Sequence, residues 1–411
     1  ASPAILVPNA PSHPAHLAKS AVLLSIGSLR PDHLHAYNPN TRVVTPALDA
    51  FAAEATVFEN AQSTEGSTKP ALASLLTGLY PTSHGVKGRD ARLADEALLV
   101  SEAFKQAGFA TAGFVSDAYL SAQFGFDQGW DQYKSYVRED ESGDAVALFR
   151  DAARWIEARK GERFFLFLQT NETSASSDPS AHVADRDRPH LEALYDAAIS
   201  DQDRQLGPFI ERLKTLGLYD QIALFVTADH GEEFGDHGSY GHGRSIYQEL
   251  LHVPLVARLP ARSAGRIADT VSIVDVAPTL LAAAGAPVPP VMEGVDRLTS
   301  APSTNAPSTN APLAAFSDFL GDERVVRAGR WKLVSRAGAP SLFDLQSDPH
   351  ELHALEPSAH PIALRYCRIL LGQFLGSPDR RDWFSADPKG RSVALKSETV
   401  AIDPAAAAGG D

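Results

Sequence analysis

Residues 224–238 read Leu-Phe-Val-Thr-Ala-Asp-His-Gly-Glu-Glu-Phe-Gly-Asp-His-Gly. The apolar half of this segment predicts a buried β-strand that ends at the pair Asp229 and His230. Open α/β sheets bind ligands at the carboxyl ends of their strands, so this strand would deliver a carboxylate and an imidazole to that edge. Both groups are suitable ligands for a divalent cation. The segment therefore predicts half of a metal site.

Apolar runs that alternate with helical patterns extend over most of the chain and indicate an α/β fold. Strands are expected at 21–26, 109–115, 164–169, 221–228 and 253–258, and helices at 46–55, 69–77, 95–107, 144–159 and 188–216. This alternation predicts a large, mostly parallel sheet sandwiched by helices. Further along, short β-like pieces at 324–328, 331–335 and 341–345 precede a helix near 359–375. They predict a small antiparallel sheet with one helix.

Composition divides the chain into five parts. Residues 1–20 are rich in Pro, Ala, Ser and His and predict an irregular arm, whereas residues 21–300 carry the α/β pattern. Residues 301–312 repeat Ala-Pro-Ser-Thr-Asn and predict a linker or an exposed loop. Residues 313–385 are expected to form a C-terminal α+β subdomain, and residues 386–411 a flexible tail.

The overall composition excludes some classes of function. The formal net charge of -14 over 411 residues argues against a general nucleic-acid binder, because such proteins normally show a basic face. An anionic small substrate stays compatible with this charge, since an acidic protein can hold a local basic pocket. The single cysteine, Cys367, excludes an internal disulfide. No run reaches the roughly 20 apolar residues of a membrane span, so none is expected.

A second informative segment, residues 68–78, reads Thr-Lys-Pro-Ala-Leu-Ala-Ser-Leu-Leu-Thr-Gly. Pro70 suits the first turn of a helix and Gly78 suits its end. Thr68 would lie at the helix N-terminus, where free N–H groups and the helix dipole favour an anion. Two interpretations stay open. Thr68 is a helix N-cap, or its hydroxyl attacks a phosphorus or sulfur centre after a metal has lowered its pKa.

Residues 68–78 resemble the sulfatase signature Cys/Ser/Thr-x-Pro-Ser-Arg-Ala-Ser-Leu-Leu-Thr-Gly, with Thr68 in the nucleophile position and departures at Ala71 and Leu72. Further stretches are similar to the same family in the same order, namely 29–34, 45–49, 78–86, 229–238, 241–247, 253–255, 274–281 and 342–351. The chain thus resembles the sulfatases of the alkaline phosphatase superfamily. That resemblance implies their fold, an ester hydrolase activity and a divalent cation.

The resemblance also reveals three departures at the expected reaction centre. The family's first strand delivers an Asp, often two, to the metal, but Gly27 and Ser28 stand in those places. The Arg that supports the nucleophile is Leu72. The strand near 164–168 normally runs into a His-containing loop, but residues 169–174 read Gln-Thr-Asn-Glu-Thr-Ser. A Thr nucleophile also cannot become the formylglycine of true sulfatases, although it allows phosphatase-like or phosphonate-ester chemistry.

What the resemblance leaves is an incomplete site. Asp229 and His230 are the expected metal ligands, and Gly27 stands in place of the family's Asp. The expected catalytic residues are Thr68, Lys69, His242 and Arg244, with Lys87 as a further candidate. If a buried charge pair is the guide, losing one carboxylate weakens cation binding by about 3–5 kcal/mol. We therefore expect no cofactor, or a weakly bound Ca, Mg, Mn or Zn ion. Glu172 is a candidate replacement carboxylate, and Lys69 a candidate replacement for the lost Arg charge, but solvation is the simpler interpretation of both.

Two functions of different class follow from this site. The first is a sulfatase-like pseudoenzyme whose hydrolase activity is lost or strongly impaired and whose fold serves binding or a structural role. The alternative is an active, metal-dependent hydrolase of sulfate, phosphate or phosphonate esters that uses Thr68 as nucleophile. A protein or an anionic glycan is the expected class of partner, and no nucleic acid. Family resemblance, a start at Ala1 and a lone methionine at Met292 suggest an extracytoplasmic protein whose natural start is missing.

Overall fold

The structure is a computed structural model that describes residues 18–88, 90–139, 145–159, 161–171, 188–298, 314–319, 323–336 and 338–376. Within these ranges a main sheet has eight strands in the order β10-β2-β9-β6-β1-β5-β3-β4. Their bounds are β1 (Ser20–Ile26), β2 (Thr56–Gln62), β3 (Ala110–Val115), β4 (Gln132–Ser135), β5 (Phe164–Thr170), β6 (Ile222–Thr227), β9 (Leu255–Arg258) and β10 (Gly265–Ser272). All neighbouring strands are parallel except β9, which is antiparallel to both β2 and β6.

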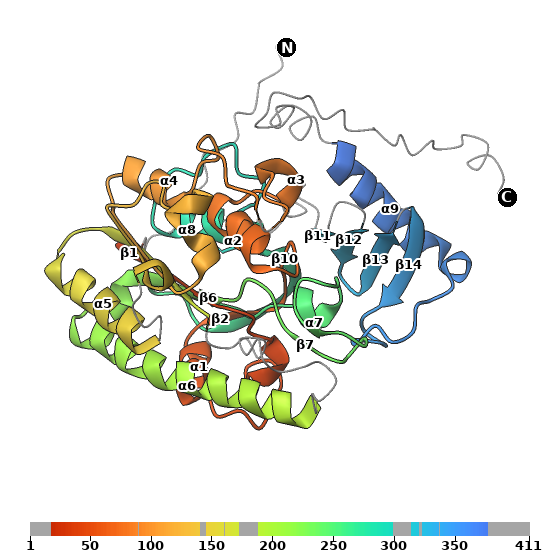
Figure 1. The fold of residues 1–411 in the computed structure, drawn as a ribbon, viewed down its shortest axis with the longest axis horizontal. Helices are drawn as coiled ribbons and strands as arrows, with labels where there is room; N and C mark the ends of the chain where they lie inside the picture. Colours follow the sequence, from red (N-terminus) through yellow and green to blue (C-terminus); the bar gives the residue numbers. More distant parts are fainter. Residues whose placement is uncertain are drawn as a thin grey trace, which may run out of the picture.

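Helices cover both faces of the main sheet (Figure 1). On one face lie α1 (Pro46–Ala53), α5 (Ala145–Ala158) and α6 (Arg188–Thr215), and on the other α2 (Thr68–Thr77), α3 (Pro81–His84), α4 (Val100–Gln106) and α8 (Val276–Ala283). The three central strands β1, β5 and β6 are therefore buried at every position. Burial on both faces explains why they appear in the sequence as continuous apolar runs rather than as alternating patterns. Among the described residues, no helix has the length and apolar character needed to cross a bilayer.

The register of the central strands sets where the site forms. Ile26 of β1 lies opposite Thr170 of β5, and Ser25 of β1 lies opposite Thr227 of β6. The residues that follow these three strands therefore meet at one edge of the sheet. They are Gly27, Asn171 and Asp229, together with the neighbouring residues of each.

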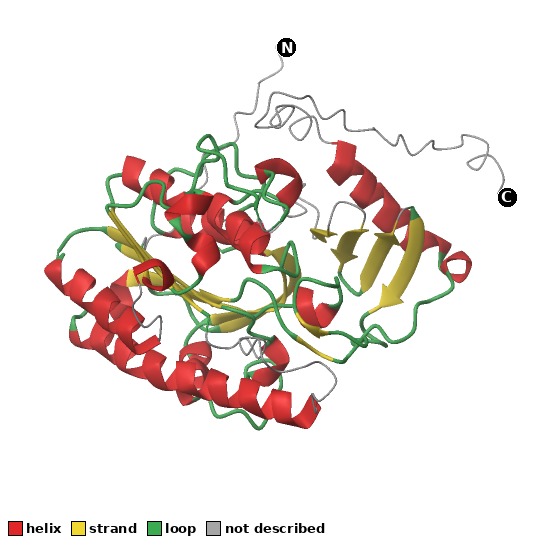
Figure 2. Ribbon diagram, viewed as in Figure 1, coloured by secondary structure: helices red, strands yellow, loops and turns green. Residues whose placement is uncertain are grey.

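A smaller antiparallel sheet lies beside the main one (Figure 2). It consists of β11 (Ala314–Phe319), β12 (Glu323–Ala328), β13 (Trp331–Arg336) and β14 (Ala339–Asp344), and α9 (Pro361–Gly376) packs on one of its faces. Apolar side chains of the opposite face pack against the segment that carries α7 (Gln248–Leu251). The predicted fold class is therefore confirmed, including the small sheet with its helix.

A buried ion pair joins this small sheet to the α7 segment. Lys332 Nζ lies 2.7 Å from Glu351 Oε1, and both side chains are fully buried. Lys332 also donates to the carbonyl of Ile246 at 2.6 Å. Glu351 Oε2 accepts a hydrogen bond from the backbone N–H of Gln248 at 2.6 Å. Each charge thus has a charged partner and a backbone partner, which is the condition for tolerable burial.

Several expected elements differ from those observed. The predicted helix at 95–107 begins only at Val100, because Glu102 at its third position accepts from the backbone N–H of Leu99 and fixes the start there. Strands β2, β4, β10 and β11 were not predicted. Three of them, β2, β4 and β10, carry polar or exposed positions that disguise the strand pattern. The predicted linker at 301–312, the tail from 386, Glu172 and residues 1–17 of the predicted arm lie outside the described residues.

Candidate active site

The Asp229-His230 pair follows β6 after one intervening residue, and both side chains are buried. The backbone N–H of Ser28, after β1, donates to Asp229 Oδ1 at 3.1 Å. The other carboxylate oxygen, Oδ2, is buried and has no hydrogen-bond partner among the described residues. It lies 3.3 Å from His230 Nε2. Burial raises the pKa of Asp229 to about 6, since the charged form loses its solvation.

The hydrogen bonds of His230 define which nitrogen carries its proton. Nδ1 lies 2.8 Å from the carbonyl oxygen of Gly231, which only accepts, so Nδ1 must donate. Burial and the nearby His242 lower the pKa of His230 to about 3, so the ring is neutral and Nε2 carries a lone pair. That lone pair accepts the hydroxyl proton of Thr68 at 3.0 Å. His230 Nε2 therefore has no proton to donate to Asp229 Oδ2, and a bound cation would satisfy this carboxylate oxygen.

Thr68 occupies the first position of α2, and its hydroxyl points to His230 rather than to the helix backbone. The residue at the cap position is Ser67, which makes no side-chain cap hydrogen bond. Thr68 is therefore not the N-cap, and that interpretation was wrong. The helix ends at Gly78, whose φ of 67° is the left-handed conformation expected for glycine there.

Lys69 points into an aromatic pair rather than into solvent. Its Nζ lies 3.8 Å from the ring centroid of Phe124 and 5.3 Å from that of Tyr119. The side chain is buried, and burial lowers its pKa. The expectation that Lys69 is simply solvated is therefore wrong, because cation–π contacts with two aromatic rings hold its ammonium group.

His242 lies close to His230, with ring centroids 4.5 Å apart. Its Nδ1 is 2.9 Å from Glu232 Oε2. Although burial opposes it, this hydrogen bond and the charge of Glu232 raise the pKa of His242. Sequence reasoning missed Glu232, even though the residue lies in the quoted segment. In contrast, Arg244 is exposed and makes no hydrogen bond or ion pair to any described residue, so it is not gathered with the others.

The space beside Gly27 is filled by a residue of the neighbouring strand end. A β-carbon built on Gly27 would lie 2.8 Å from Asn171 Oδ1 and 3.0 Å from the carbonyl oxygen of Thr170. Asn171 Nδ2 donates to Asp117 Oδ2 at 3.0 Å. Asp117 is buried, and burial raises its pKa to about 6. Sequence reasoning missed Asp117 and Asn171, although each follows the end of a predicted strand and so belongs to the same sheet edge.

Lys87, the remaining candidate, and two other residues of the family-like segments have different surroundings. Leu72 is fully buried in the hydrophobic core. Lys87 is exposed. His237 stacks on Tyr247 with ring centroids 3.5 Å apart, and its Nδ1 lies 2.5 Å from Glu249 Oε1. Among the residues that the structure describes, no three His, Cys, Asp or Glu side chains are placed to hold one metal ion. A cation at Asp229 and His230 therefore needs donors of another kind.

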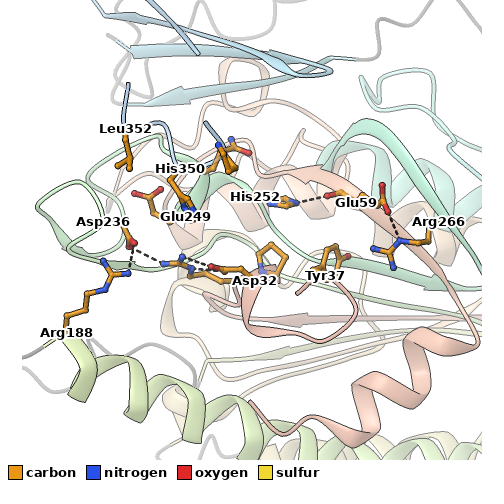
Figure 3. A pocket seen from close by; sticks show the side chains of 14 residues that line it. Asp32, Tyr37, Glu59, Arg188, Asp236, Glu249, His252, Arg266, His350 and Leu352 are labelled. Carbon is orange, nitrogen blue, oxygen red and sulfur yellow. Dashed lines mark hydrogen bonds and ion pairs between the residues drawn. The ribbon is translucent and has the colours of Figure 1, made fainter. Parts of the chain in front are cut away.

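A separate pocket of about 550 Å³ opens between the main sheet and the segment after β14 (Figure 3). Arg30 lies at its wall and forms an ion pair with Asp32 at 2.8 Å and with Asp236 at 3.2 Å. Arg188 also forms an ion pair with Asp236, at 2.9 Å. Neither Thr68 nor Asp229 lines this pocket. Its Arg side chains are already paired with carboxylates, so the pocket is polar without being a strongly basic anion site.

Known protein families match most of this chain. The Sulfatase family model matches residues 19–286, and the model described as N-sulphoglucosamine sulphohydrolase, C-terminal, matches residues 235–363. The chain belongs to the sulfatase family. This membership also places it in the alkaline phosphatase superfamily, as the sequence motifs had suggested.

Similar sulfatases with curated descriptions include arylsulfatase K of Bos taurus, 31% identical over 194 residues, which are 44% of this chain and 36% of that protein. An ulvan-active sulfatase of Formosa agariphila is 25% identical over 379 residues, 78% of this chain and 73% of that protein. The match to arylsulfatase K thus spans little more than a third of that relative.

Solved sulfatase-like structures agree on the fold. A 2-O GAG sulfatase superposes with a TM-score of 0.75 at 18% identity, covering 92% of this chain and 96% of that one. A phosphonate monoester hydrolase from Silicibacter pomeroyi superposes with a TM-score of 0.72 at 19% identity, covering 87% and 94%. At these identities the likeness establishes the architecture and leaves the chemistry to be argued from the site.

Proposed function

We propose that this chain is a sulfatase-family protein whose hydrolase chemistry at Thr68 is lost or strongly impaired, and whose fold serves binding or a structural role. The observation that carries the proposal is the lack of a side chain at Gly27, at the end of β1. Gly27 offers no side-chain ligand, and Asn171 Oδ1 fills the space that a side chain there would enter. A neutral amide that follows another strand thus lies against Gly27, where the family resemblance expects an acidic side chain. A cation held by fewer charges binds less tightly and activates a hydroxyl less.

Leu72 supports the same proposal independently. In the family signature this position carries the Arg that supports the nucleophile, but Leu72 is fully buried in the apolar core. A leucine cannot stabilise the charge that develops on a sulfate or phosphate ester in the transition state. Lys69 restores a positive charge nearby, but it is held against Phe124. Two changes at different elements thus weaken two different parts of the reaction.

The alternative is a metal-dependent hydrolase of sulfate, phosphate or phosphonate esters. It is favoured by the hydrogen bond from Thr68 to neutral His230 and by Asp229 Oδ2, which has no hydrogen-bond partner in the described part of the chain. Asp229 and His230 would hold a divalent ion, which would lower the pKa of a bound hydroxyl and polarise the ester. In this case the Thr68 oxygen, after losing its proton to water, would bond to the phosphorus or sulfur centre as the alcohol of the ester leaves, and His242, which forms an ion pair with Glu232, would give that alcohol a proton.

Turnover of aryl sulfate and aryl phosphate esters tests the two functions. The wild-type chain and its Thr68→Ala variant are assayed with Ca, Mg, Mn or Zn supplied. We expect rates close to the uncatalysed background for both proteins. The matched control is Thr215→Ala, which removes an exposed hydroxyl at the end of α6. Turnover that Thr68→Ala abolishes and Thr215→Ala preserves would establish the alternative instead.

An anionic glycan is the ligand class that we propose for the binding function. The support is the names of similar proteins, which include an ulvan-active sulfatase and a 2-O GAG sulfatase. Binding of sulfated and desulfated forms of one polysaccharide tests the idea, and equal affinity for both would contradict it. We also propose an extracytoplasmic location on the basis of family membership, which fractionation of the source cells tests directly.

A further inference from the structure

The pocket of about 550 Å³ beside Arg30 lies apart from Thr68, and neither of the two functions considered above uses it. We propose that this pocket binds an uncharged, hydroxyl-rich ligand, and that a short neutral saccharide is the chemical class that its lining fits. The volume falls within the range of about 300–1,000 Å³ that small-molecule sites occupy. The inference goes beyond the proposed function, because it holds whether or not Thr68 takes part in a reaction.

The charged groups that line the pocket already balance one another. Two of its three arginines are held by carboxylates, as described above. Toward the other end of the row in Figure 3, Arg266 Nε lies 2.5 Å from Glu59 Oε1. A further carboxylate of the lining, Glu249, lies 2.5 Å from His237. A charged ligand would have to displace one of these partners or stay without a counter-charge, and both are costly, so the balance favours a ligand without net charge.

The paired side chains still have hydrogen-bonding positions left over. A carboxylate has about four lone-pair sites, and each oxygen of Asp32 accepts one hydrogen bond from Arg30. Nη1 of Arg188 and Nη1 of Arg266 donate to no atom in the described part of the chain. Glu59 Oε2 likewise accepts from none of the described residues. A hydroxyl group both donates and accepts, so it can bond either kind of side chain without bringing a charge.

His252 adds a neutral acceptor to the lining. Its Nε2 lies 2.8 Å from the carbonyl oxygen of Glu59, which only accepts, so Nε2 carries the proton. Nδ1 then holds a lone pair, and it has no hydrogen-bond partner among the residues that the structure describes. Burial and the nearby Arg327 lower the pKa of this imidazole to about 4, so the ring is neutral near pH 7. His252 can thus accept from a hydroxyl group but offers an anion no charge.

Apolar walls complete the lining and suit the C–H faces of a sugar ring. The Tyr37 hydroxyl accepts from the backbone N–H of Leu255 at 2.8 Å and donates to the carbonyl of the same residue at 3.1 Å. Its hydrogen bonds are therefore made within the fold, and its ring adds apolar surface to the wall. Pro349 and Leu352, from the segment after β14, add more (Figure 3). Apolar walls with a few polar groups are typical of small-molecule pockets, and a neutral saccharide presents C–H faces and hydroxyls to match.

Saturation-transfer NMR and isothermal titration of the full chain test the inference. The probes are the methyl glycosides of glucose, galactose, mannose and xylose, and the charged counterparts are glucuronic acid and glucosamine. At least one methyl glycoside should bind with a dissociation constant of about 1 mM, a value ordinary for a small polar ligand, and more tightly than both charged sugars. Binding of none of the four glycosides, or tighter binding of a charged sugar, would overturn the inference.

Leu352→Trp tests the location. Leu352 lines the pocket and is 59% exposed, so a larger side chain there narrows the pocket without disturbing the core. The variant should weaken binding of the methyl glycoside by about fivefold or more. The matched control is Leu194→Trp on α6, an exposed leucine that does not line the pocket, and it should bind as the wild type does. Equal affinity in the two variants would contradict the placement.

Glu59→Gln and Arg266→Gln test the chemistry, because each leaves the other member of a partly exposed ion pair without its counter-charge. Glu59→Gln should shift the preference toward glucuronic acid, and Arg266→Gln toward glucosamine. Misfolding would weaken all ligands and cannot produce opposite shifts. Unchanged preference in both variants would refute the argument from charge balance. Ester turnover and the comparison of sulfated with desulfated polysaccharide are measured separately, so the proposed function can fail while this inference stands, and the reverse.

Discussion

The buried ion pair between Lys332 and Glu351 should govern how firmly the small sheet is attached to the main domain. Both side chains are fully buried, and their charged atoms are 2.7 Å apart. Lys332→Met leaves the Glu351 carboxylate buried without its cation, although it keeps the N–H of Gln248. Removing one partner of a buried pair costs about 3–5 kcal/mol, and we expect a loss of that size.

The companion change Glu351→Gln should cost less. The glutamine still offers an oxygen to Gln248, and the pKa of Lys332 is already lowered by burial, so the lysine can lose its charge. The double variant carries no unpaired charge. It should therefore be about 2 kcal/mol more stable than the sum of the two single losses predicts, within the range found for residues in contact.

Urea unfolding of the full chain measures these free energies. Circular dichroism follows both sheets, and the fluorescence of Trp331, on β13 beside Lys332, reports the small sheet. The control is Lys214→Met, which breaks an exposed ion pair with Glu211 and should change the stability by less than about 1 kcal/mol. The reasoning is refuted if Lys332→Met costs no more than this control, or if the effects of the two changes in the double variant simply add.

Three further predictions concern other parts of the chain. Val86 N–H donates to Nδ1 of buried His84, whose pKa burial lowers to about 3 from 6.5, so the fold favours neutral imidazole. The contribution of neutral His84 to the free energy of unfolding is complete above pH 6.5 and falls as the pH drops toward 3. Between pH 6.5 and 5 the free energy of unfolding should decrease by about 2 kcal/mol. A series of unfolding midpoints against pH should show this decrease in the wild type and not in His84→Gln. Gly231→Ala places a β-carbon 1.9 Å from the carbonyl of Glu249, so the backbone must shift; thermal unfolding should show a large loss, and a wild-type midpoint would disprove the close approach. Tyr195→Phe removes a hydroxyl that accepts from the backbone N–H of Arg30 and donates to the carbonyl of Ser28, in the turn after β1. Urea unfolding should show that the free energy of unfolding falls by about 1–3 kcal/mol. A loss near zero would mean that these two hydrogen bonds do not stabilise the fold.

The sequence predicted best those strands that are buried on both faces of the sheet. The strands β1, β5 and β6 are buried throughout, and their apolar runs predicted them to within a residue or two. The edge strands β4 and β10 were missed, because polar and exposed positions interrupt any pattern on strands with one free side.

Some residues of the candidate site were predicted from the sequence and others were missed. Asp229, His230 and Thr68 were predicted because each stands in a local motif, and the structure brings them together. Asp117 and Asn171 were missed because their position after a predicted strand is the only local sign that marks them, and neither belongs to a motif. Their significance comes from strand neighbours more than 50 residues away in the chain.

The sequence by itself indicated the family and the positions of the central strands, and it predicted that Gly27 stands where the family resemblance expects an acidic residue. These are local facts, because a strand end and its next residue are read from consecutive letters. Only the tertiary structure decided which side chain lies against Gly27. Parallel pairing places Asn171 beside Gly27, and a hydrogen bond to Asp117 turns its oxygen that way. The same packing directs the Thr68 hydroxyl to His230 instead of to the helix end, since orientation is set by the neighbours that a side chain meets and not by its place in the chain.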